Sequence, residues 1–335
     1  MELLGPVTVD DYHTAGEPFR IVVGGGPALT GATVLDRRSD AMARFDALRA
    51  FLVHEPRGHA DMYGCFVTEP DDADGDLGVV FFHKDGFSTA CGHGTIALAR
   101  WAIDTGRVPR VEPVTRLVID VPSGRLVVHA DVVDGSVRAI RFRNVWSWVA
   151  GLDVAVPGLG LRVDIAYGGA LYAIVRADAL GLTLAPNDLG ELIGVARRIK
   201  GALAGHPLVR HPDDARLSGL YGVIAYDERA AVGGAALHQG NVTVFADGEV
   251  DRSPCGSGTS ARLAALFARG ELGVGDVLAH DGIAGGRFLA HVVEAGTSAD
   301  RPAVVTEISG MAYRTGRATF VLELGDPLGA GFLLR

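Results

Sequence analysis

The stretch CGHGTIA at residues 91–97 has a near copy, CGSGTSA, at residues 255–261. Aligned on their cysteines without gaps, the two segments share the pattern C-G-x-G-T-x-A and a Val-Phe pair upstream, at residues 80–81 and 244–245. For a single copy, a tight packing turn would be the simplest interpretation. Packing alone gives no reason to keep a thiol at the same point of two such loops, so the repeat indicates two related halves that each contribute part of one site.

The residues around each copy predict the same local structure. A β-rich apolar run comes first, at Leu77–Phe82 and at Asn241–Ala246, and an Ala- and Leu-rich helical pattern follows the cysteine, at Ile96–Ile103 and at Ala261–Phe267. Each cysteine is therefore expected where a glycine-rich loop enters a helix. Backbone N–H groups without intrahelical partners and the positive end of the helix dipole meet at that place, which favours anionic groups.

The cysteine inventory argues against other roles for these residues. Three cysteines, at positions 65, 91 and 255, do not make up a disulfide framework. The chain has no CxxC or HExxH pattern, so no metal site is expected, and it has no phosphate-binding GxxxxGK[ST] loop. Cys65 lies in an apolar stretch and is expected to be a small buried core residue.

Two equivalent thiols suit the inversion of an amino acid at its α-carbon. Inversion needs a base on one face of that carbon and an acid on the other, and Cys91 and Cys255 can supply both, exchanging roles for the opposite enantiomer. A helix N-terminus lowers the pKa of a thiol and favours the thiolate. Backbone N–H groups expected to hold the substrate carboxylate belong to Gly92, His93, Gly256 and Ser257. Asp251 and His93 are the candidate partners for the substrate ammonium.

Composition narrows the class of protein further. The 335-residue chain has a formal net charge of −9 and basic residues scattered singly or in pairs, so no nucleic-acid-binding surface is expected. No apolar stretch reaches the length that crosses a bilayer, and the start of the chain lacks a basic segment followed by an apolar one. We therefore expect a cytoplasmic protein without membrane contact that acts on a small molecule.

Several motifs together resemble the proline racemase family, whose members are proline racemases, 4-hydroxyproline 2-epimerases and trans-3-hydroxyproline dehydratases. They run the length of the chain: HTAGEP at residues 13–18, EPRGH at 55–59, DMYG at 61–64, CGHG at 91–94 and DRSPCGSG at 251–258. The last of these is the most specific to the family.

This resemblance implies an α+β fold of the diaminopimelate-epimerase type, with two similar halves, each a curled β-sheet around a central helix, and the active site in the cleft between them. It also implies that Cys91 and Cys255 flank the substrate α-carbon without a cofactor or metal, and that loop amides hold the carboxylate. Asp251 and His93 match the family residues that contact the ring nitrogen. A homodimer is implied as well.

The boundary between the halves is expected near Asn144–Gly151, where a strand-like run ends. The final segment, Ala303–Glu323, alternates like a strand and is expected to return to the first half. The first half then comprises residues 1–147 and 303–335 and carries Cys91, and the second comprises residues 148–302 and carries Cys255. Residues 188–203 are expected to form a surface helix.

The motifs and the cysteines favour different activities, dehydration in one case and inversion in the other. DMYG at 61–64, LYG at 220–222, VFAD at 244–247 and GFLL at 331–334 look most like the dehydratase branch, in which one cysteine is replaced by serine or threonine. This chain keeps both thiols, and reprotonation on the opposite face needs the second, so we favour racemisation or epimerisation of proline or a hydroxyproline. The alternatives are a trans-3-hydroxy-L-proline dehydratase with cysteine at position 255 and, from another class, a non-catalytic amino-acid-binding or thiol redox protein.

Overall fold

A computed structural model describes residues 5–334 of the chain. By their contacts these residues form two compact units, one made of the residues up to Ile140 together with those from Met311 onward, the other of Arg141–Gly310. Each unit contains one of the helices that follow the repeated motif, α3 (Gly92–Asp104) in the first and α5 (Gly256–Ala268) in the second.

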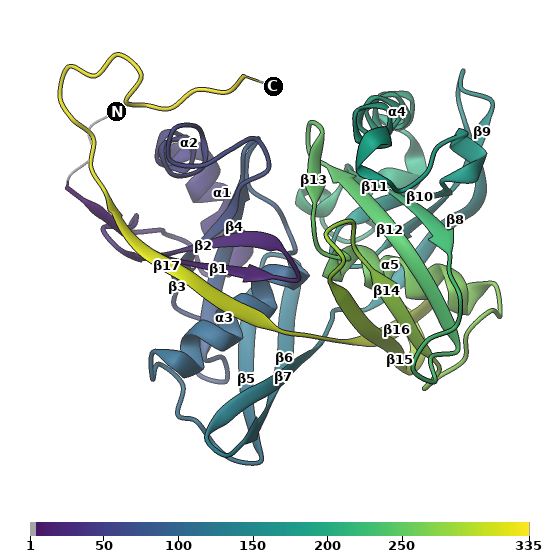
Figure 1. The fold of residues 1–335 in the computed structure, drawn as a ribbon, viewed down its shortest axis with the longest axis horizontal. Helices are drawn as coiled ribbons and strands as arrows, with labels where there is room; N and C mark the ends of the chain where they lie inside the picture. The colour runs from purple at the N-terminus through teal and green to yellow at the C-terminus, as the bar shows by residue number, and fades with distance from the viewer. Residues whose placement is uncertain (1–4, 335) are drawn as a thin grey trace. The chain divides into compact units, whose positions relative to one another are not determined.

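The first unit is a sheet with the strand order β17–β1–β2–β3–β4–β5–β6, antiparallel except for the pairs β2/β3 and β4/β5. Parallel neighbours need a crossover, which α1 and α2 supply for the first pair and α3 for the second. Because α3 packs against β1, β2, β6 and β17, the sheet curls around it (Figure 1). The elements are β1 (Val7–Thr14), β2 (Glu17–Gly24), α1 (Val34–Arg44), α2 (Asp46–Val53), β3 (Tyr63–Thr68), β4 (Leu77–His83), β5 (Val114–Val121), β6 (Gly124–Val133), β7 (Ser136–Arg143) and β17 (Ala312–Phe320).

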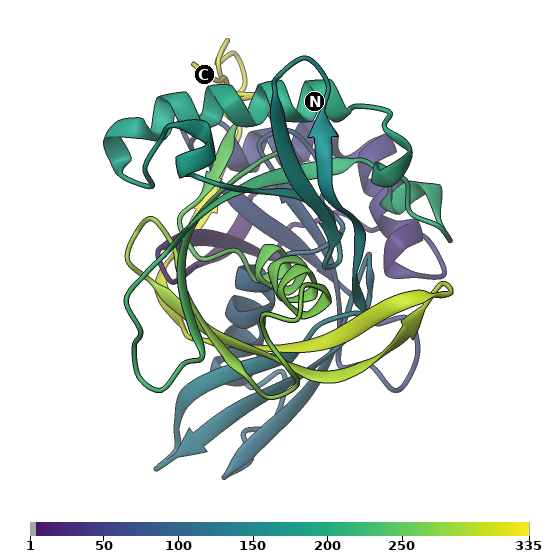
Figure 2. The same ribbon diagram turned by 90° about the vertical axis from the view of Figure 1, so that its right-hand side faces the viewer.

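The second unit closes its sheet into a ring, because β16 pairs with β8 at the end of the order β8–β9–β10–β11–β12–β14–β15–β16. Figure 2 shows α5 in the middle of this ring, where it packs against β8, β9, β10, β15 and β16. The elements are β8 (Ser147–Val156), β9 (Leu161–Tyr167), β10 (Leu171–Arg176), α4 (Leu189–Leu203), β11 (Leu220–Glu228), β12 (Leu237–Phe245), β13 (Glu249–Asp251), β14 (Val277–Asp281), β15 (Arg287–Ser298) and β16 (Arg301–Gly310).

The two units repeat one order of connections. In each, helical segments bridge a parallel pair (β2/β3 and β10/β11), an antiparallel pair follows (β3/β4 and β11/β12), and the motif helix then bridges a second parallel pair (β4/β5 and β12/β14). The predicted fold class, α+β with two similar halves that each curl a sheet around a central helix, is confirmed. The predicted surface helix is α4, which buries only the stripe Leu192, Ala196, Ile199 and Leu203.

The motif helices begin earlier than the sequence pattern predicts, at Gly92 and Gly256, so the G-x-G-T part of the motif is the first helical turn rather than a loop. Close approach of neighbouring atoms explains the second glycine of each motif, Gly94 and Gly258. A Cβ at Gly94 would lie 2.4 Å from the Phe19 ring and 2.7 Å from the Cys91 sulfur. In the part of the chain that the structure describes, no helix has the length and apolar character needed to cross a membrane.

The unit boundaries differ from the expected ones. The segment Ala303–Glu323 is two strands, β16 and β17, and only β17 pairs with β1 of the first unit. Residues 303–310 belong to the second unit because β16 pairs with β15 and with β8, where Ala303 lies opposite Trp148. The contacts therefore divide the chain after Ile140 and after Gly310.

Candidate active site

Cys91 is the N-cap residue of α3 and has an extended backbone (φ −155°, ψ 101°). Its sulfur accepts a hydrogen bond from the backbone N–H of Gly94 at 3.2 Å and lies 3.4 Å from the Nε2 atom of His93. Both Cys91 and His93 are buried. The sulfur therefore accepts one amide N–H, a contact that stabilises a thiolate, and lies beside the His93 imidazole.

His93 is held in place through both its ring and its backbone. The rings of Phe19 and Tyr63 meet it edge to face, at centroid distances of 5.7 and 5.0 Å. The hydroxyl of Thr14 donates to the His93 carbonyl at 2.9 Å.

Gly92 and His93 are the first two residues of α3, so their N–H groups have no carbonyl four residues back within the helix.

Cys255 is the N-cap residue of α5, but its backbone is left-handed (φ 61°, ψ 104°), a region that residues with a side chain rarely adopt. Its sulfur lies 3.7 Å from the hydroxyl of Tyr172, which in turn lies 2.7 Å from the hydroxyl of Ser257. All three residues are buried. Strained backbone at a buried thiol is typical of functional sites.

The pKa of the Cys255 thiol is raised above its ordinary value, first by burial and then by the negative charge of Asp251. Hydrogen bonds from the Gly258 N–H and from Tyr172 and Ser257 offset only part of this increase in pKa. The prediction that a helix N-terminus lowers the pKa of this thiol is therefore wrong, because loss of solvation outweighs the favourable contacts. Cys255 is held as the neutral thiol.

Asp251 is connected to Cys255 through one intervening side chain. Asp251, the last residue of β13, is buried, and its Oδ1 atom accepts the N–H and the hydroxyl of Ser253 at 2.8 and 2.7 Å. The Ser253 hydroxyl oxygen accepts the Cys255 N–H at 3.1 Å. The DRSPC segment thus ties the carboxylate to the backbone of the cysteine.

Within the first unit, the structure brings together Cys91, Gly92 and His93, and within the second it brings together Asp251, Cys255, Gly256 and Ser257. Tyr172 is a contact that the sequence does not reveal, because a tyrosine in an apolar strand such as β10 is normally a core residue. Cys65, by contrast, lies in the core of β3, and burial raises its pKa well above the ordinary value, as expected of a packing residue.

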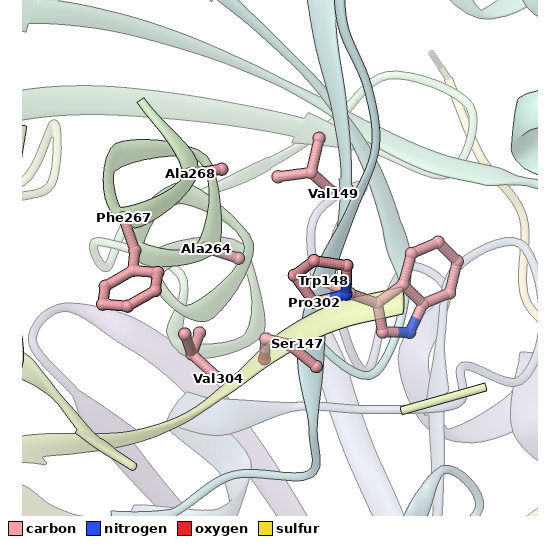
Figure 3. Close-up of a pocket in the computed structure, with 9 residues that line it drawn as sticks. Ser147, Trp148, Val149, Ala264, Phe267, Ala268, Pro302 and Val304 are labelled. Atoms are coloured by element: carbon pink, nitrogen blue, oxygen red, sulfur yellow. The ribbon is translucent and has the colours of Figure 1, made fainter. Parts of the chain in front are cut away.

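The second unit also contains a cavity of about 380 Å³ (Figure 3). Its lining comes from α5, β8 and β16 and consists of Ser147, Trp148, Val149, Ala264, Phe267, Ala268, Pro302, Ala303 and Val304. None of these residues is ionisable. At a rise of about 1.5 Å per residue, Ala264 lies roughly 13 Å along α5 from Cys255. This cavity cannot supply the acid/base chemistry.

Comparisons with known proteins agree with these motifs. Residues 9–333 match the family model described as "Proline racemase". A trans-3-hydroxy-L-proline dehydratase of Colwellia psychrerythraea is 42% identical over 328 residues, which cover 97% of this chain and 92% of that protein. A proline racemase of Clostridioides difficile is 41% identical over 328 residues, covering 97% of each chain.

A solved structure shows the same fold over nearly all of both chains. The hydroxyproline epimerase from Agrobacterium vitis with bound trans-4-hydroxy-L-proline matches with a TM-score of 0.91 at 31% identity, covering 100% of this chain and 97% of that one. These two relatives and this structure each match over at least 92% of both chains, and the family model matches residues 9–333. The chain therefore belongs to the proline racemase family.

Proposed function

We propose that this protein is a cofactor-independent racemase or epimerase that inverts the α-carbon of proline or a hydroxyproline. The observation that carries the proposal is the matched placement of two buried thiols, Cys91 and Cys255, each at the N-cap position of the helix that begins with the C-G-x-G-T motif of its unit. One thiol suffices to remove an α-proton. A second acid/base group is needed to return a proton to the opposite face.

The different surroundings of the two thiols support different resting roles. The contacts of Cys91 with the Gly94 N–H and the His93 imidazole favour its thiolate, which takes the α-proton. Cys255 is held as the thiol and delivers its proton to the other face of the carbon. The two sulfurs end the reaction with their protonation states exchanged, ready for the opposite enantiomer.

In this proposal the remaining site residues bind the substrate. The first-turn N–H groups hold the carboxylate, and neutralising it makes the α-proton more acidic. They belong to Gly92, His93, Gly256 and Ser257. The buried Asp251 carboxylate and the His93 imidazole are the partners proposed for the ring nitrogen.

A second candidate is a trans-3-hydroxy-L-proline dehydratase, favoured by the 42% identity to the relative of that name. Dehydration needs one base, because the 3-hydroxyl leaves from the β-carbon and no proton returns to the opposite face. Cys91 would then remove the α-proton, and Cys255 would be dispensable for it.

Proton NMR in heavy water separates these candidates, using L-proline, trans-4-hydroxy-L-proline and trans-3-hydroxy-L-proline in separate tubes. Deuterium at the α-position together with optical inversion or a new diastereomer supports the proposal and names the substrate. Loss of the trans-3-hydroxy-L-proline signals to an imine product supports the dehydratase instead. Silence in all three tubes contradicts both and favours a non-catalytic amino-acid-binding protein.

A further inference from the structure

A buried polar cluster formed by Asn241, Thr259 and His280 lies next to the Cys255 turn. The three side chains come from β12, α5 and β14, and each is at most 1% exposed. Asn241 and Thr259 both donate to the carbonyl oxygen of Pro254, at 2.9 and 3.2 Å. This carbonyl belongs to the peptide bond that leads into Cys255.

The direction of each hydrogen bond in the cluster follows from its chemistry. The Asn241 amide nitrogen only donates, so the Nε2 atom of His280, 3.0 Å away, accepts and carries no proton. The Nδ1 atom of His280 then carries the proton and donates to the Thr259 hydroxyl oxygen at 2.8 Å, which leaves the hydroxyl proton for Pro254. Burial lowers the pKa of His280 to about 3, so the imidazole stays neutral and the pattern persists near neutral pH.

The first unit has a different arrangement at the matching positions. In the alignment without gaps, Leu77 takes the position of Asn241. Thr95, the counterpart of Thr259, donates its hydroxyl to the carbonyl of Cys91 itself, at 2.8 Å, and not to the residue before the cysteine. The backbone of Cys91 is extended, whereas that of Cys255 is left-handed. The polar cluster therefore accompanies the strained cysteine.

We propose that Asn241, Thr259 and His280 are positioning residues that hold Cys255 in its left-handed conformation. The inference rests on the proposed function, in which Cys255 is one of two acid/base groups. The orientation of the Pro254 carbonyl sets the φ angle of Cys255, and a residue with a side chain relaxes from positive φ unless its surroundings prevent it. Relaxation would carry the sulfur away from the Tyr172 hydroxyl, now 3.7 Å distant, and out of line with the substrate.

The test compares one substitution in both motifs, Thr259→Val and Thr95→Val, and follows each thiol separately. Alkylation of Cys255 and Cys91 by iodoacetamide is measured against pH by peptide mass spectrometry, without substrate. We expect Thr259→Val to raise the pH of half-maximal alkylation at Cys255 and to leave Cys91 unchanged, because only Cys255 moves away from the Tyr172 hydroxyl, whose contact lowers the pKa of this thiol. Thr95→Val should leave the Cys255 alkylation profile unchanged. Thr259→Ser keeps the hydroxyl and should therefore give the wild-type Cys255 profile.

Asn241→Leu tests the cluster from a second side, should the valine variant misfold, because leucine is the residue of the first unit at this position. On a substrate that the wild type inverts, Thr259→Val and Asn241→Leu should lower kcat by about 100-fold with little change in KM, since a displaced acid/base group affects the chemical step. Wild-type Cys255 profiles in both folded variants, or equal shifts at Cys91 and Cys255, would overturn the inference. Alkylation needs no substrate, so the positioning role of the cluster is tested separately from the proposed function. A wild type that is inactive on proline and hydroxyprolines would refute the proposed function only.

Discussion

The two cysteines occupy the same position of a repeated motif but differ in backbone and partners. Cys91 is extended and contacts an amide N–H and an imidazole, whereas Cys255 is left-handed and contacts the hydroxyl of Tyr172. Burial and the charge of Asp251 raise the pKa of Cys255. In the proposed function, a turnover starts with one sulfur as the thiolate and the other as the thiol.

The charge of Asp251 gives a prediction about pH. Asp251→Asn keeps the side-chain shape and a carbonyl acceptor for Ser253 but removes the negative charge that disfavours the Cys255 thiolate. The pKa of Cys255 should therefore fall, and half-maximal alkylation of this thiol should move to lower pH. The initial rate of alkylation of this thiol by iodoacetamide, followed against pH by peptide mass spectrometry, measures the change, because the rate follows the thiolate fraction.

Asp247→Asn is the matched control for that experiment, because Asp247 lies shortly before Asp251 in the chain but is exposed and paired with Arg197. It should leave the Cys255 profile where it is in the wild type. A profile that stays in place or moves to higher pH in Asp251→Asn contradicts the assigned electrostatic role.

Gly94 gives a prediction about packing. In Gly94→Ala the new methyl group would lie 2.4 Å from the ring of Phe19, which is fully buried, and 2.7 Å from the Cys91 sulfur. Overpacking of this kind costs about 1–3 kcal/mol of unfolding free energy, and displacement of the sulfur should also reduce turnover. Urea unfolding followed by circular dichroism checks the stability, and Gly201→Ala is the control.

Gly201 lies within α4, where an added Cβ has no neighbour within 4 Å. Its replacement by alanine should leave stability unchanged or raise it by up to about 1 kcal/mol. Equal urea midpoints for Gly94→Ala and the wild type would show that the first turn of α3 is not packed as described.

Among the elements, the motif helices and the strands before them are predictable because their signals are local. Apolar runs and Ala/Leu patterns indicate β4, β12, α3 and α5 from neighbouring residues alone. The split of the segment 303–323 into β16 and β17 is not predictable, because both strands alternate in the same way and only their distant partners, β8 and β1, distinguish them.

The contacts of Cys255 with distant strands are not predictable from the sequence for the same reason. Tyr172 and His280 lie on strands far from Cys255 in the chain, and their role depends on pairing that a sequence pattern does not encode. The direction of the Cys255 pKa shift depends on burial by the whole unit, which outweighs the local effect of the helix terminus.

The attachment of strand β17 to the first unit depends on one buried carboxylate, that of Asp10 in β1, which also contacts α3. Asp10 of β1 accepts hydrogen bonds from Arg314 and Arg317 of β17, each at 2.8 Å, and from the indole of Trp101 in α3 at 3.2 Å. Asp10→Asn should lower the unfolding free energy by about 2–4 kcal/mol, because a buried acceptor of charged groups is lost. The midpoint of urea unfolding measures this change.

Asp178→Asn provides the comparison, since Asp178 pairs with Arg176 at the surface of the second unit. Exposed ion pairs contribute little, so its urea midpoint should match the wild type. If the two variants behave alike, Asp10 does not hold β17 in the first unit.

At the scale of the whole molecule, the repeated motif predicts two related halves, and the common order of connections in the two units agrees with it. The place where the chain crosses between units is less predictable. One crossing falls within β7 and the other between β16 and β17, and no glycine- or proline-rich linker marks either of them.

In the proposed function two thiols act on one α-carbon, and the rate of optical inversion is the property that depends on both of them. The rate of inversion of L-proline and of trans-4-hydroxy-L-proline, followed by chiral chromatography, is compared for Cys91→Ser, Cys255→Ser and the core control Cys65→Ala. We expect the inversion rate of each serine variant to fall by about 10²–10⁴-fold, because each direction requires both sulfurs, while Cys65→Ala stays near the wild type. A serine variant that inverts as fast as the wild type would contradict the two-thiol mechanism.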